Sequence, residues 1–521
     1  MSGRRGPSEG PSRGWFMAGA QATPTGETGG VTRIGADNLD RDPPMTMLLD
    51  RPDADAVPQP IPSRMTRTRT RAQIPTWWRD AVGAATWSSM LMVVALWVAG
   101  GGLQDLTGWA SALTSVGRLT GLVSSDLLLL QVLLLARIPM VERVCGQDEL
   151  VRRHRLVGFW SFWLMAAHVV LITVGYAATV AINPFVQLWE LTVDYPGMLL
   201  AVAGTVALVM VVVTSLRRAR SALRYESWHL LHLYAYLGVG LALPHQLWTG
   251  QEFLNSPVAT IYWWTLWASA AGSVLVFRVG LPLYRSVRHG LRVESVIRES
   301  DDVVSVTVRG RDLDRLDPLP GQFFSWRFLN GPGWTRAHPY SLSAVPADDT
   351  MRITVKELGD GSRALADLTP GTRVLIEGPY GRLHRGVRTR RKVTLMAAGI
   401  GICPMRALLE GLPQDPGDVT LLYRARSEAD LALTKELDDL SRRTGARVVY
   451  LPGRRIPHRP TWLPEAAAHF SDAEALRHLV PDVAEHDVFI CGSAAWMDAA
   501  RVAALDCGVP AQRIHLERFS W

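Results

Sequence analysis

One stretch of the sequence reads HRLVGFWSFWLMAAHVVLITVGYA, from His154 to Ala177. It is apolar after its first two residues, and about 20 such residues suffice for a helix to cross a lipid bilayer. It begins with His154, and a second histidine, His168, follows fourteen positions later. Fourteen residues make nearly four helical turns, so both imidazoles lie on one helix face, roughly 20 Å apart along the axis. This segment predicts a membrane helix that carries two histidines on one side.

Apolar stretches on both sides of this one extend the prediction to a bundle of six membrane-spanning helices. The six spans lie near residues 83–103, 115–136, 156–177, 196–216, 228–247 and 258–280. A large buried helical core is the alternative explanation for such runs. Six of them within about 200 residues favour a membrane domain instead.

The loops between the spans predict the orientation of the bundle. Segments 137–155 and 217–224 are rich in arginine, whereas segments 104–114, 178–195 and 248–257 contain no lysine or arginine. Cytoplasmic loops of membrane proteins carry the excess of positive residues. We therefore expect a multi-pass protein of the cell membrane, embedded in the lipid bilayer, with both termini in the cytoplasm.

The remainder of the chain differs from the apolar region in composition. The mean hydropathy of +0.09 averages a polar N-terminal segment, the apolar region and a C-terminal half typical of soluble proteins. Residues 1–78 lack hydrophobic periodicity and predict a disordered cytoplasmic tail without a cleavable signal peptide. The net charge of +7 is spread along the chain, so we expect no nucleic-acid partner. The four cysteines are widely spaced, which argues against a disulfide framework, structural zinc or an iron–sulfur cluster.

A second pair of histidines matches the first. His232 and His245 lie thirteen positions apart in the fifth span, which runs in the same direction as the third. Two parallel helices with histidines at matching depths can form two stacked sites, and haem iron accepts axial imidazoles. We expect an inner haem between His154 and His232. An outer haem would then lie between His168 and His245. His229 is the alternative to His232, although it lies off the face of His245.

After the sixth span the pattern changes to short alternating strands, at residues 292–298 and 303–308. Four motifs follow in order, namely Pro320–Phe324 (PGQFF), His338–Ser343 (HPYSLS), Lys356–Ser362 (KELGDGS) and Gly378–Gly381 (GPYG). In this order they resemble the ferredoxin–NADP reductase superfamily. Together with the six spans they resemble, more closely, the ferric reductase and NADPH oxidase group. The resemblance covers about residues 80–521.

This resemblance implies a multidomain membrane protein. A six-helix transmembrane haem domain would span residues 79–285. An antiparallel β-barrel domain that binds FAD would follow at residues 288–388. An α/β domain with a parallel sheet that binds NAD(P) would complete the chain at residues 389–521.

The HPYS segment carries the resemblance to flavin-binding proteins. The superfamily holds its flavin with an Arg-x-Tyr-Ser/Thr segment, and Tyr340 and Ser341 match the last two positions. His338 and Pro339 match an oxidase-type variant. The tyrosine ring can pack on the isoalloxazine, and the Ser341 hydroxyl can approach N5, which makes Ser341 a predicted catalytic residue. A glycine turn comes next and leads into a helix expected at residues 362–368. The resemblance implies that residues in and just before this turn also bind the flavin cofactor, namely Lys356, Gly359, Gly361 and Ser362.

A second glycine turn follows the buried strand expected at residues 392–398. It reads GIGICP from Gly399 to Pro404 and leads into a helix expected from Met405. A strand, a glycine turn and a helix start place backbone amides where a pyrophosphate can bind. The turn resembles the family's Gly-x-Gly-x-x-Pro motif, which implies nucleotide-binding roles for Gly399, Gly401 and Pro404. It lacks the third glycine of the dinucleotide fingerprint.

The next strand, expected at residues 419–423, leads into Arg424 and Arg426. Arginines at this place suit a 2′-phosphate, whereas an acidic residue would suit a free ribose. The two arginines therefore favour NADPH, with NADH as the alternative. A solvated basic loop is the explanation that involves no cofactor.

The C-terminal residues complete the predicted site. Strand 487–491 leads into the pair Cys491 and Gly492, and the family has a Cys-Gly pair beside the nicotinamide. The resemblance implies that Cys491 packs near the hydride path and is no covalent nucleophile. It also implies that Glu517 helps to move protons and that Trp521 stacks on the flavin until the nicotinamide displaces it.

The resemblance implies an NAD(P)H-dependent flavohaem oxidoreductase of the ferric reductase or oxidase type. Electrons would pass from cytoplasmic NADPH through FAD and two haems b to ferric iron or oxygen on the outer side. One alternative is a conduit that reduces a membrane or extracytoplasmic protein partner. Another is a transporter or scaffold with a vestigial reductase. The outer loops contain no clear metal site. The sequence therefore does not distinguish between a small-molecule or ionic electron acceptor and a protein partner that accepts the electrons.

Overall fold

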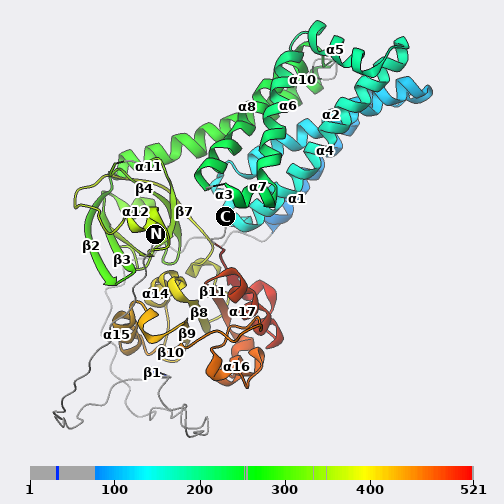
Figure 1. Ribbon diagram of the computed structural model, residues 1–521. Helices are drawn as coiled ribbons and strands as arrows, with labels where there is room; N and C mark the ends of the chain where they lie inside the picture. The colour runs from blue at the N-terminus through cyan, green and yellow to red at the C-terminus, as the bar shows by residue number, and fades with distance from the viewer. Residues whose placement is uncertain are drawn as a thin grey trace, which may run out of the picture.

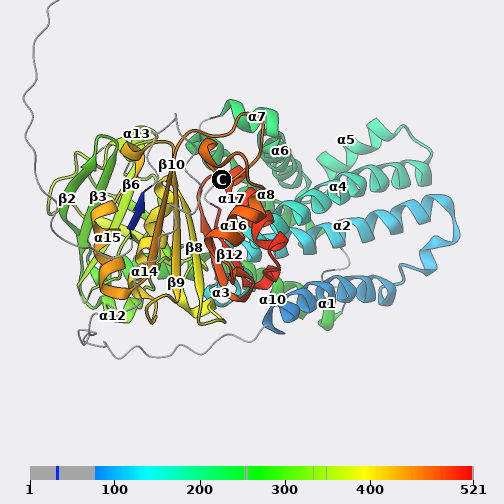
Figure 2. The same ribbon diagram turned by 90° about the horizontal axis from the view of Figure 1, so that it is seen from below.

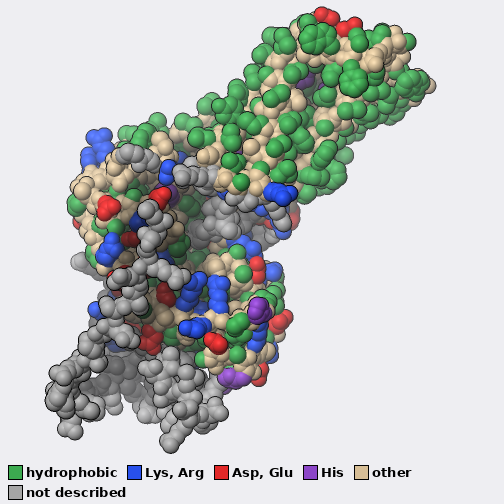
Figure 3. Space-filling view, viewed as in Figure 1, with side chains coloured by type: hydrophobic (Ala, Val, Ile, Leu, Met, Phe, Trp, Pro, Cys, Tyr) green, Lys and Arg blue, Asp and Glu red, His purple; other side chains and the backbone are tan. Residues whose placement is uncertain are grey.

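The computed structural model describes residues 31–33, 77–223, 225–250, 253, 256–331, 334–347 and 349–518. A helical bundle comes first in the chain and projects to one side of two sheet-containing domains, as Figures 1 and 2 show. Hydrophobic side chains cover most of the bundle face seen in Figure 3, whereas charged side chains gather on the sheet-containing domains. This separation of surfaces fits a bundle surrounded by lipid.

Long helices cover all six predicted spans. They are α1 (Trp77–Ala99), α2 (Trp109–Leu134), α4 (Gln147–Val180), α6 (Met198–Ser215), α8 (Tyr225–Trp248) and α10 (Pro257–Ser273). The last of these continues through the π-helix η3 (Val274–Gly280) into α11 (Leu281–His289). Five helical regions are long and apolar enough to cross a membrane, at 80–99, 109–134, 149–180, 198–215 and 257–289. Helix α8 has a similar length but is more polar, because it carries histidines, Pro244 and Gln246.

Shorter helices connect the long ones, namely η2 (Gln104–Thr107), α3 (Pro139–Cys145), α5 (Pro184–Asp194) and α7 (Arg217–Ala222). Helix α2 packs against α4, and α6 packs against α8, while α1 and α10 lie beside α2. Gly204 and Gly238 allow α6 and α8 to approach closely. A Cβ at Gly204 would lie 2.6 Å from the carbonyl oxygen of Gly238.

Two antiparallel sheets of three strands each follow the bundle. One contains β2 (Arg292–Ser300), β3 (Val303–Arg309) and β6 (Thr350–Lys356), and the other β5 (His338–Ser341), β4 (Phe323–Phe328) and β7 (Val374–Tyr380). Single bridges, Arg292 with Arg373 and Leu342 with Ile353, join them at both edges. The sheets enclose one apolar core that includes Phe324 and Trp326. The predicted antiparallel barrel is thus present as two sheets joined by single bridges.

The C-terminal domain is built on a parallel sheet with the order β1-β10-β9-β8-β11-β12. Its strands are β8 (Val393–Ala398), β9 (Val419–Ala425), β10 (Arg447–Pro452), β11 (Asp487–Cys491) and β12 (Ile514–Leu516). Helices α14 (Ile402–Gly411) and α15 (Thr434–Thr444) pack on one face, and α16 (Asp472–Leu479) and α17 (Ala494–Asp506) on the other (Figure 2). The carboxyl ends of these strands meet at one edge, where α/β sheets bind their ligands.

The N-terminal segment contributes one strand that the sequence analysis did not predict. Strand β1 (Val31–Arg33) pairs in parallel with β10 at the edge of the sheet. Edge pairing uses backbone groups, so three residues can form it without hydrophobic periodicity. Helix α1 begins at Trp77, two residues inside the predicted tail. Residues 1–30 and 34–76 lie outside the described part of the chain.

Two predicted helices differ from the observed ones. The helix expected at 362–368 is the short α13 (Asp360–Arg363), followed by turns. Helix α14 begins at Ile402, within the glycine motif, and not at Met405. Helix α13 starts directly after Gly359 and includes Gly361, and α14 starts directly after Gly401, so each begins earlier than the apolar pattern predicts.

Candidate functional site

His154 and His232 face each other from α4 and α8, with ring centroids 6.0 Å apart. Nδ1 of His154 lies 3.3 Å from the Gln131 carbonyl oxygen on α2, and Nδ1 of His232 lies 3.3 Å from Oγ of Ser215. A histidine whose Nδ1 is engaged in this way presents Nε2 to a metal. The fold therefore brings the predicted inner pair together.

His168 and His245 occupy the outer parts of the same two helices. Nδ1 of His168 lies 2.8 Å from the Gly117 carbonyl oxygen, a distance at which a protonated Nδ1 donates a hydrogen bond. A Cβ at Gly121 would lie 2.5 Å from this Nδ1, so only glycine leaves room for the ring. His168 and His245 are close enough to interact electrostatically. The structure thus also places the predicted outer pair together.

The donor chemistry of the histidine pairs fits haem. The 6.0 Å between the inner rings leaves room for one metal atom with metal–nitrogen bonds of about 2 Å. Within the described residues, no group of three or more His, Cys, Asp or Glu side chains can hold a metal ion. A metal between two imidazoles therefore needs further donors from a ligand, and a porphyrin supplies four nitrogens.

His229 has a different environment from His232. It interacts electrostatically with Arg278 and with Arg327 and Glu377, which belong to β4 and β7. Its side chain therefore lies toward the two antiparallel sheets. The structure directs His232 toward His154 and gives His229 another position.

The HPYS segment forms β5 and lies against the first glycine turn. The rings of His338 and Tyr340 are stacked with centroids 5.8 Å apart, because residues on either side of Pro339 project from one face of the strand. Ser341 is buried. A Cβ at Gly361 would lie 2.5 Å from Cε1 of His338, so a glycine is required under this ring. Two motifs separated in the sequence therefore form one surface.

Ser362 stabilises the turn itself. Its Oγ accepts hydrogen bonds from the backbone amides of Leu358 at 2.8 Å and Gly359 at 3.0 Å. Lys356, just before the turn, binds Asp302 at 2.9 Å and Asp430 at 3.2 Å. Hydrogen bonding to Asp302 raises the pKa of Lys356. The Lys356 ammonium thus connects the antiparallel sheets to the parallel-sheet domain.

The second glycine turn packs against the predicted Cys-Gly pair. Gly399 has a φ of +54°, and Gly401 lies so close to β11 that a Cβ there would be 2.3 Å from the Cys491 carbonyl oxygen. Pro404 is buried in the first turn of α14, and Gly492 follows Cys491 at the same sheet edge. Burial raises the pKa of the Cys491 thiol, which keeps it protonated. This fits a packing role and no nucleophilic one.

Glu517 joins two motifs of different domains. It is buried, and a Cβ at Gly381 of the GPYG motif would lie 2.6 Å from Oε2 of Glu517. Glu517 also interacts electrostatically with Cys491. The C-terminal segment therefore brings a carboxyl group between the GPYG motif and the Cys-Gly pair. Trp521, the predicted flavin-stacking residue, lies outside the described residues.

Arg424 points into the protein. It is buried and donates hydrogen bonds to the carbonyls of Leu451 at 3.2 Å and Arg454 at 2.9 Å. Burial and the neighbouring Arg455 lower the pKa of Arg424 to about 10. Arg426 and Arg455 are exposed at the same sheet edge. The structure therefore leaves Arg426 accessible to a phosphate and uses Arg424 to hold the ends of β9 and β10 together.

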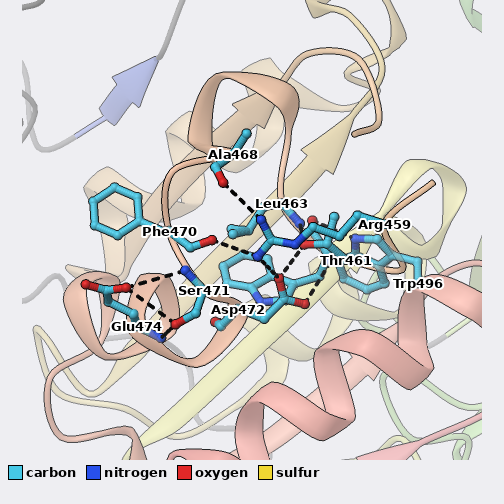
Figure 4. Close-up of polar contacts among 10 residues, drawn as sticks. Arg459, Thr461, Leu463, Ala468, Phe470, Ser471, Asp472, Glu474 and Trp496 are labelled. Carbon is cyan, nitrogen blue, oxygen red and sulfur yellow. Dashed lines mark hydrogen bonds and ion pairs between the residues drawn. The ribbon is translucent and has the colours of Figure 1, made fainter. Parts of the chain in front are cut away.

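A polar network holds the loop between β10 and α16 (Figure 4). Asp472, the first residue of α16, accepts a hydrogen bond from Thr461. Arg459 donates to the Phe470 carbonyl oxygen at 2.7 Å. These bonds fix the loop that begins with Arg454 and Arg455 after β10, at the carboxyl edge of the sheet.

The sequence analysis missed the contacts between the bundle and the GPYG motif. The Arg137 guanidinium lies 4.3 Å from the centroid of the Tyr380 ring and 3.0 Å from the Glu142 carboxylate. Arg285 of α11 donates to the Gly378 carbonyl oxygen. In the sequence, Arg137 is one of several arginines in a basic loop, and this pattern indicated only the orientation of the bundle. Its partner Tyr380 lies in another domain, so no spacing rule could connect them.

Comparisons with protein families match both halves of this arrangement. Residues 120–243 match the ferric reductase like transmembrane component, and residues 395–502 match the oxidoreductase NAD-binding domain. Two separate regions of the chain thus each resemble a known family, one in the helical bundle and one in the parallel-sheet domain. The first match includes His154, His168 and His232 and ends just before His245.

Curated relatives resemble part of the chain. It is 32% identical over 242 residues to the ferredoxin reductase component of 3-ketosteroid-9-alpha-monooxygenase from Mycobacterium tuberculosis, covering 44% of this chain and 64% of the relative. It is 27% identical over 235 residues to a flavohemoprotein from Bacillus subtilis, covering 43% of this chain and 57% of the relative. The ferric reductase-like chain thus spans less than two thirds of the length of either relative.

Solved structures also resemble parts of the ferric reductase-like chain. The flavohem-like FAD/NAD binding domain of nitric oxide dioxygenase from Vibrio cholerae is 23% identical, with a TM-score of 0.35, and 44% of this chain and 99% of that chain are covered. Flavohemoglobin from Malassezia yamatoensis is 16% identical, with a TM-score of 0.38, and 76% of this chain and 99% of that chain are covered.

Proposed function

We propose that this ferric reductase-like chain is a membrane-bound flavohaem oxidoreductase. It transfers electrons from cytoplasmic NADPH, through FAD and two haems b, to ferric iron or oxygen on the outer side. The observation that carries the proposal is the facing pair His154 and His232, with ring centroids 6.0 Å apart, in a chain that also has an NAD-binding domain.

FAD and haem, when bound, supply the conversion of a hydride into single electrons and their passage through the hydrocarbon core of ~30 Å. The chain supplies the positions. His154 and His232 bind the inner haem, and His168 and His245 bind the outer one. The Nδ1 contacts of His154, His168 and His232 would orient these three rings so that Nε2 faces the metal.

The two sheet-containing domains supply the cofactor surfaces. Tyr340 packs on the flavin ring, and the Ser341 hydroxyl lies beside it on the same strand. The turn that contains Gly399 and Gly401 offers backbone amides to the pyrophosphate of the nucleotide. Glu517, between the GPYG motif and the Cys-Gly pair, holds a proton near the hydride path.

The exposed arginines at the sheet edge favour NADPH as the electron donor. Arg426 and Arg455 can reach a 2′-phosphate, because both are exposed beside the ends of β9 and β10. NADH is the alternative donor. Both sheet-containing domains lie at the end of the bundle that carries α3 and α7 (Figure 1). The arginine-rich segments belong to this end, which supports a cytoplasmic position for the cofactor domains.

An electron conduit is the second candidate function. In that case the bundle reduces a membrane or extracytoplasmic protein partner and has no small-molecule acceptor of its own. The printed name of one relative, a ferredoxin reductase component of a monooxygenase, favours this alternative.

Haem and flavin stoichiometry tests the proposal. We expect two haems and one FAD per wild-type chain. His168→Ala and His245→Ala should each lose one haem and stop electron transfer to the outside, while NADPH still reduces the flavin. His229→Ala is the matched control and should keep both haems. Retention of both haems in His245→Ala would contradict the assignment.

The acceptor is tested with the same preparation. NADPH is added with a ferric chelate, and in a separate sample with oxygen alone. Turnover of either acceptor supports the oxidoreductase, and turnover of neither, with the haem reduced, supports the conduit. A purified protein without haem or flavin would overturn both functions.

A further inference from the structure

A fully buried carboxyl group lies in the bundle outside both histidine pairs. Asp126 of α2 is 0% exposed. Its Oδ1 accepts hydrogen bonds from Ser89 Oγ of α1 and from Tyr262 OH of α10, each at 2.7 Å. The two hydroxyls lie 2.8 Å from each other. Three helices therefore converge on one oxygen of this carboxyl group.

The other oxygen of Asp126, Oδ2, has no hydrogen-bond partner among the described residues. The described groups that interact with this carboxyl are the hydroxyls of Ser89 and Tyr262, and neither carries a positive charge. Arg118, further outward on α2, is paired with Asp105. An ionised carboxylate enclosed in this way is costly, because one oxygen lacks a donor and no cation offsets the charge. This cost rises further when a negative charge arrives nearby, and a proton on Oδ2 then removes it.

Asp126 lies at a depth between the two histidine pairs. On the same helix, the Gly117 carbonyl contacts His168, and the Gln131 carbonyl contacts His154. Asp126 is roughly 14 Å inward of Gly117 and about 8 Å outward of Gln131 along the helix axis. Its side chain faces α1 and α10, whereas the two histidines belong to α4 on the other side of α2. A charge at either pair therefore acts on this carboxyl through the low-dielectric interior.

We propose that Asp126, with Ser89 and Tyr262, is a proton-binding site whose occupancy follows the number of electrons held at the histidine pairs. The inference rests on the proposed function, because it requires that electrons arrive there. An electron supplied by the reduced flavin adds one negative charge to the bundle. One proton from water then forms an O–H bond at Oδ2 and neutralises the carboxylate.

The reverse step balances the first. When the electron leaves for the acceptor, the O–H bond breaks and the proton returns to water. The site therefore lowers the electrostatic cost of holding an electron in the membrane. Among the described groups that interact with the Asp126 carboxyl, Tyr262 of α10 is the ionisable one, and α1 contributes the Ser89 hydroxyl.

Redox titration of the purified full-length holoprotein tests this site. In the wild type, the midpoint potential of the haem should fall as pH rises, because reduction takes up a proton. In Asp126→Asn this dependence should be lost, with wild-type haem and flavin content. Asp194→Asn is the matched control, since this exposed carboxyl ends α5, and it should keep the dependence.

Tyr262→Phe provides a second variant that keeps the carboxyl group. It removes one donor that favours the carboxylate over the acid, so the pH dependence should move to higher pH. A wild-type potential that does not change with pH overturns the proposal, as does full pH dependence in Asp126→Asn. Should Asp126→Asn fail to fold, an unmoved pH dependence in Tyr262→Phe overturns it.

An infrared measurement separates this inference from the proposed function. A protonated carboxyl group has a C=O stretching band that a carboxylate lacks, and Asp126→Asn should remove one such band from the wild-type spectrum. Absence of haem from the purified protein would overturn the proposed function, whereas a haem-containing protein in which reduction produces no band that Asp126→Asn removes would overturn the proton site alone. If the infrared spectra of Asp126→Asn and the wild type are the same at every pH, the proposal of a proton-binding site at Asp126 is wrong.

Discussion

Arg424 shows how burial changes the function of a single residue. Its position after the strand expected at 419–423 predicted a contact with a 2′-phosphate, but Arg424 lies within β9, where its guanidinium is buried and donates to the carbonyls of Leu451 and Arg454. Arg455 is exposed at the same sheet edge. A phosphate that enters from solvent can pair only with an accessible guanidinium. The two arginines should therefore respond differently to substitution.

Arg455→Ala should raise the KM for NADPH by about tenfold, because a charged hydrogen bond of ~1.5 kcal/mol is lost. The KM for NADH should not change. Arg424→Ala should instead lower the free energy of unfolding by about 1–3 kcal/mol, because it leaves buried carbonyls unpaired, and it should keep the cofactor preference. Steady-state kinetics with both cofactors and thermal unfolding measure these effects. Loss of NADPH preference in Arg424→Ala alone would contradict this division of roles.

At the scale of elements, small residues determine how closely α6 can pack against α8, the helix that carries His232 and His245. A Cβ at Gly238 of α8 would lie 2.9 Å from the Gly204 carbonyl oxygen of α6. Gly240, on the same helix, has nothing within 4 Å of such a Cβ. Gly238 lies between His232 and His245, so the spacing of α6 and α8 affects the position of both histidines.

Gly238→Val should lower the free energy of unfolding by about 1–3 kcal/mol, because added methyl groups force the two helices apart. It should also reduce the haem content. Gly240→Val is the matched control and should leave the free energy of unfolding and the haem content close to the wild-type values. Thermal unfolding and the haem absorbance per chain check the pair. Equal effects of the two substitutions would show that the helix crossing does not limit haem binding.

The loop between α2 and α3 is one of two elements, with α11, that contact β7 from the bundle side. Arg137→Ala should remove a cation–π contact of ~1–2 kcal/mol with Tyr380 and slow electron transfer from flavin to haem. NADPH should reduce the flavin at the wild-type rate, because the variant leaves the nucleotide domain unchanged. Arg137→Lys keeps the positive charge but lacks the planar guanidinium group. Its rate of electron transfer from flavin to haem should lie between those of the wild type and Arg137→Ala. Stopped-flow spectroscopy separates the two steps, and a wild-type rate of haem reduction in Arg137→Ala would argue against docking through this loop.

At the scale of the whole molecule, both cofactor domains lie at one end of the bundle (Figure 1). Arginine-rich segments mark that end, and the outer loops 104–114, 178–195 and 248–257 contain no lysine or arginine. The proposed reaction therefore has a fixed direction across the membrane.

Membrane vesicles test this direction. Inside-out vesicles should oxidise added NADPH with a ferric chelate trapped in the lumen, because the cofactor domains face the medium. Right-side-out vesicles should oxidise added NADPH only after a detergent opens them. Oxidation of external NADPH by intact right-side-out vesicles would reverse the predicted orientation.

The sequence by itself predicted the elements and the order of the motifs. A long helix overlaps each of the six expected spans, and the strands expected at 292–298, 303–308, 392–398, 419–423 and 487–491 are β2, β3, β8, β9 and β11. Apolar runs and alternation are properties of adjacent residues, so they can be read without knowledge of distant contacts. The matching spacing of the histidines on α4 and α8 belongs to the same kind of local information.

The tertiary structure alone decided which side chains meet. It directed Arg424 inward, placed Arg137 over Tyr380 and brought Ser89 and Tyr262 to Asp126. It also added β1 to the edge of the parallel sheet. These outcomes depend on the rotation of each helix about its axis and on contacts between segments far apart in the chain. Periodicity within one segment carries no information about its partner, and this is the physical reason why the sequence left them open.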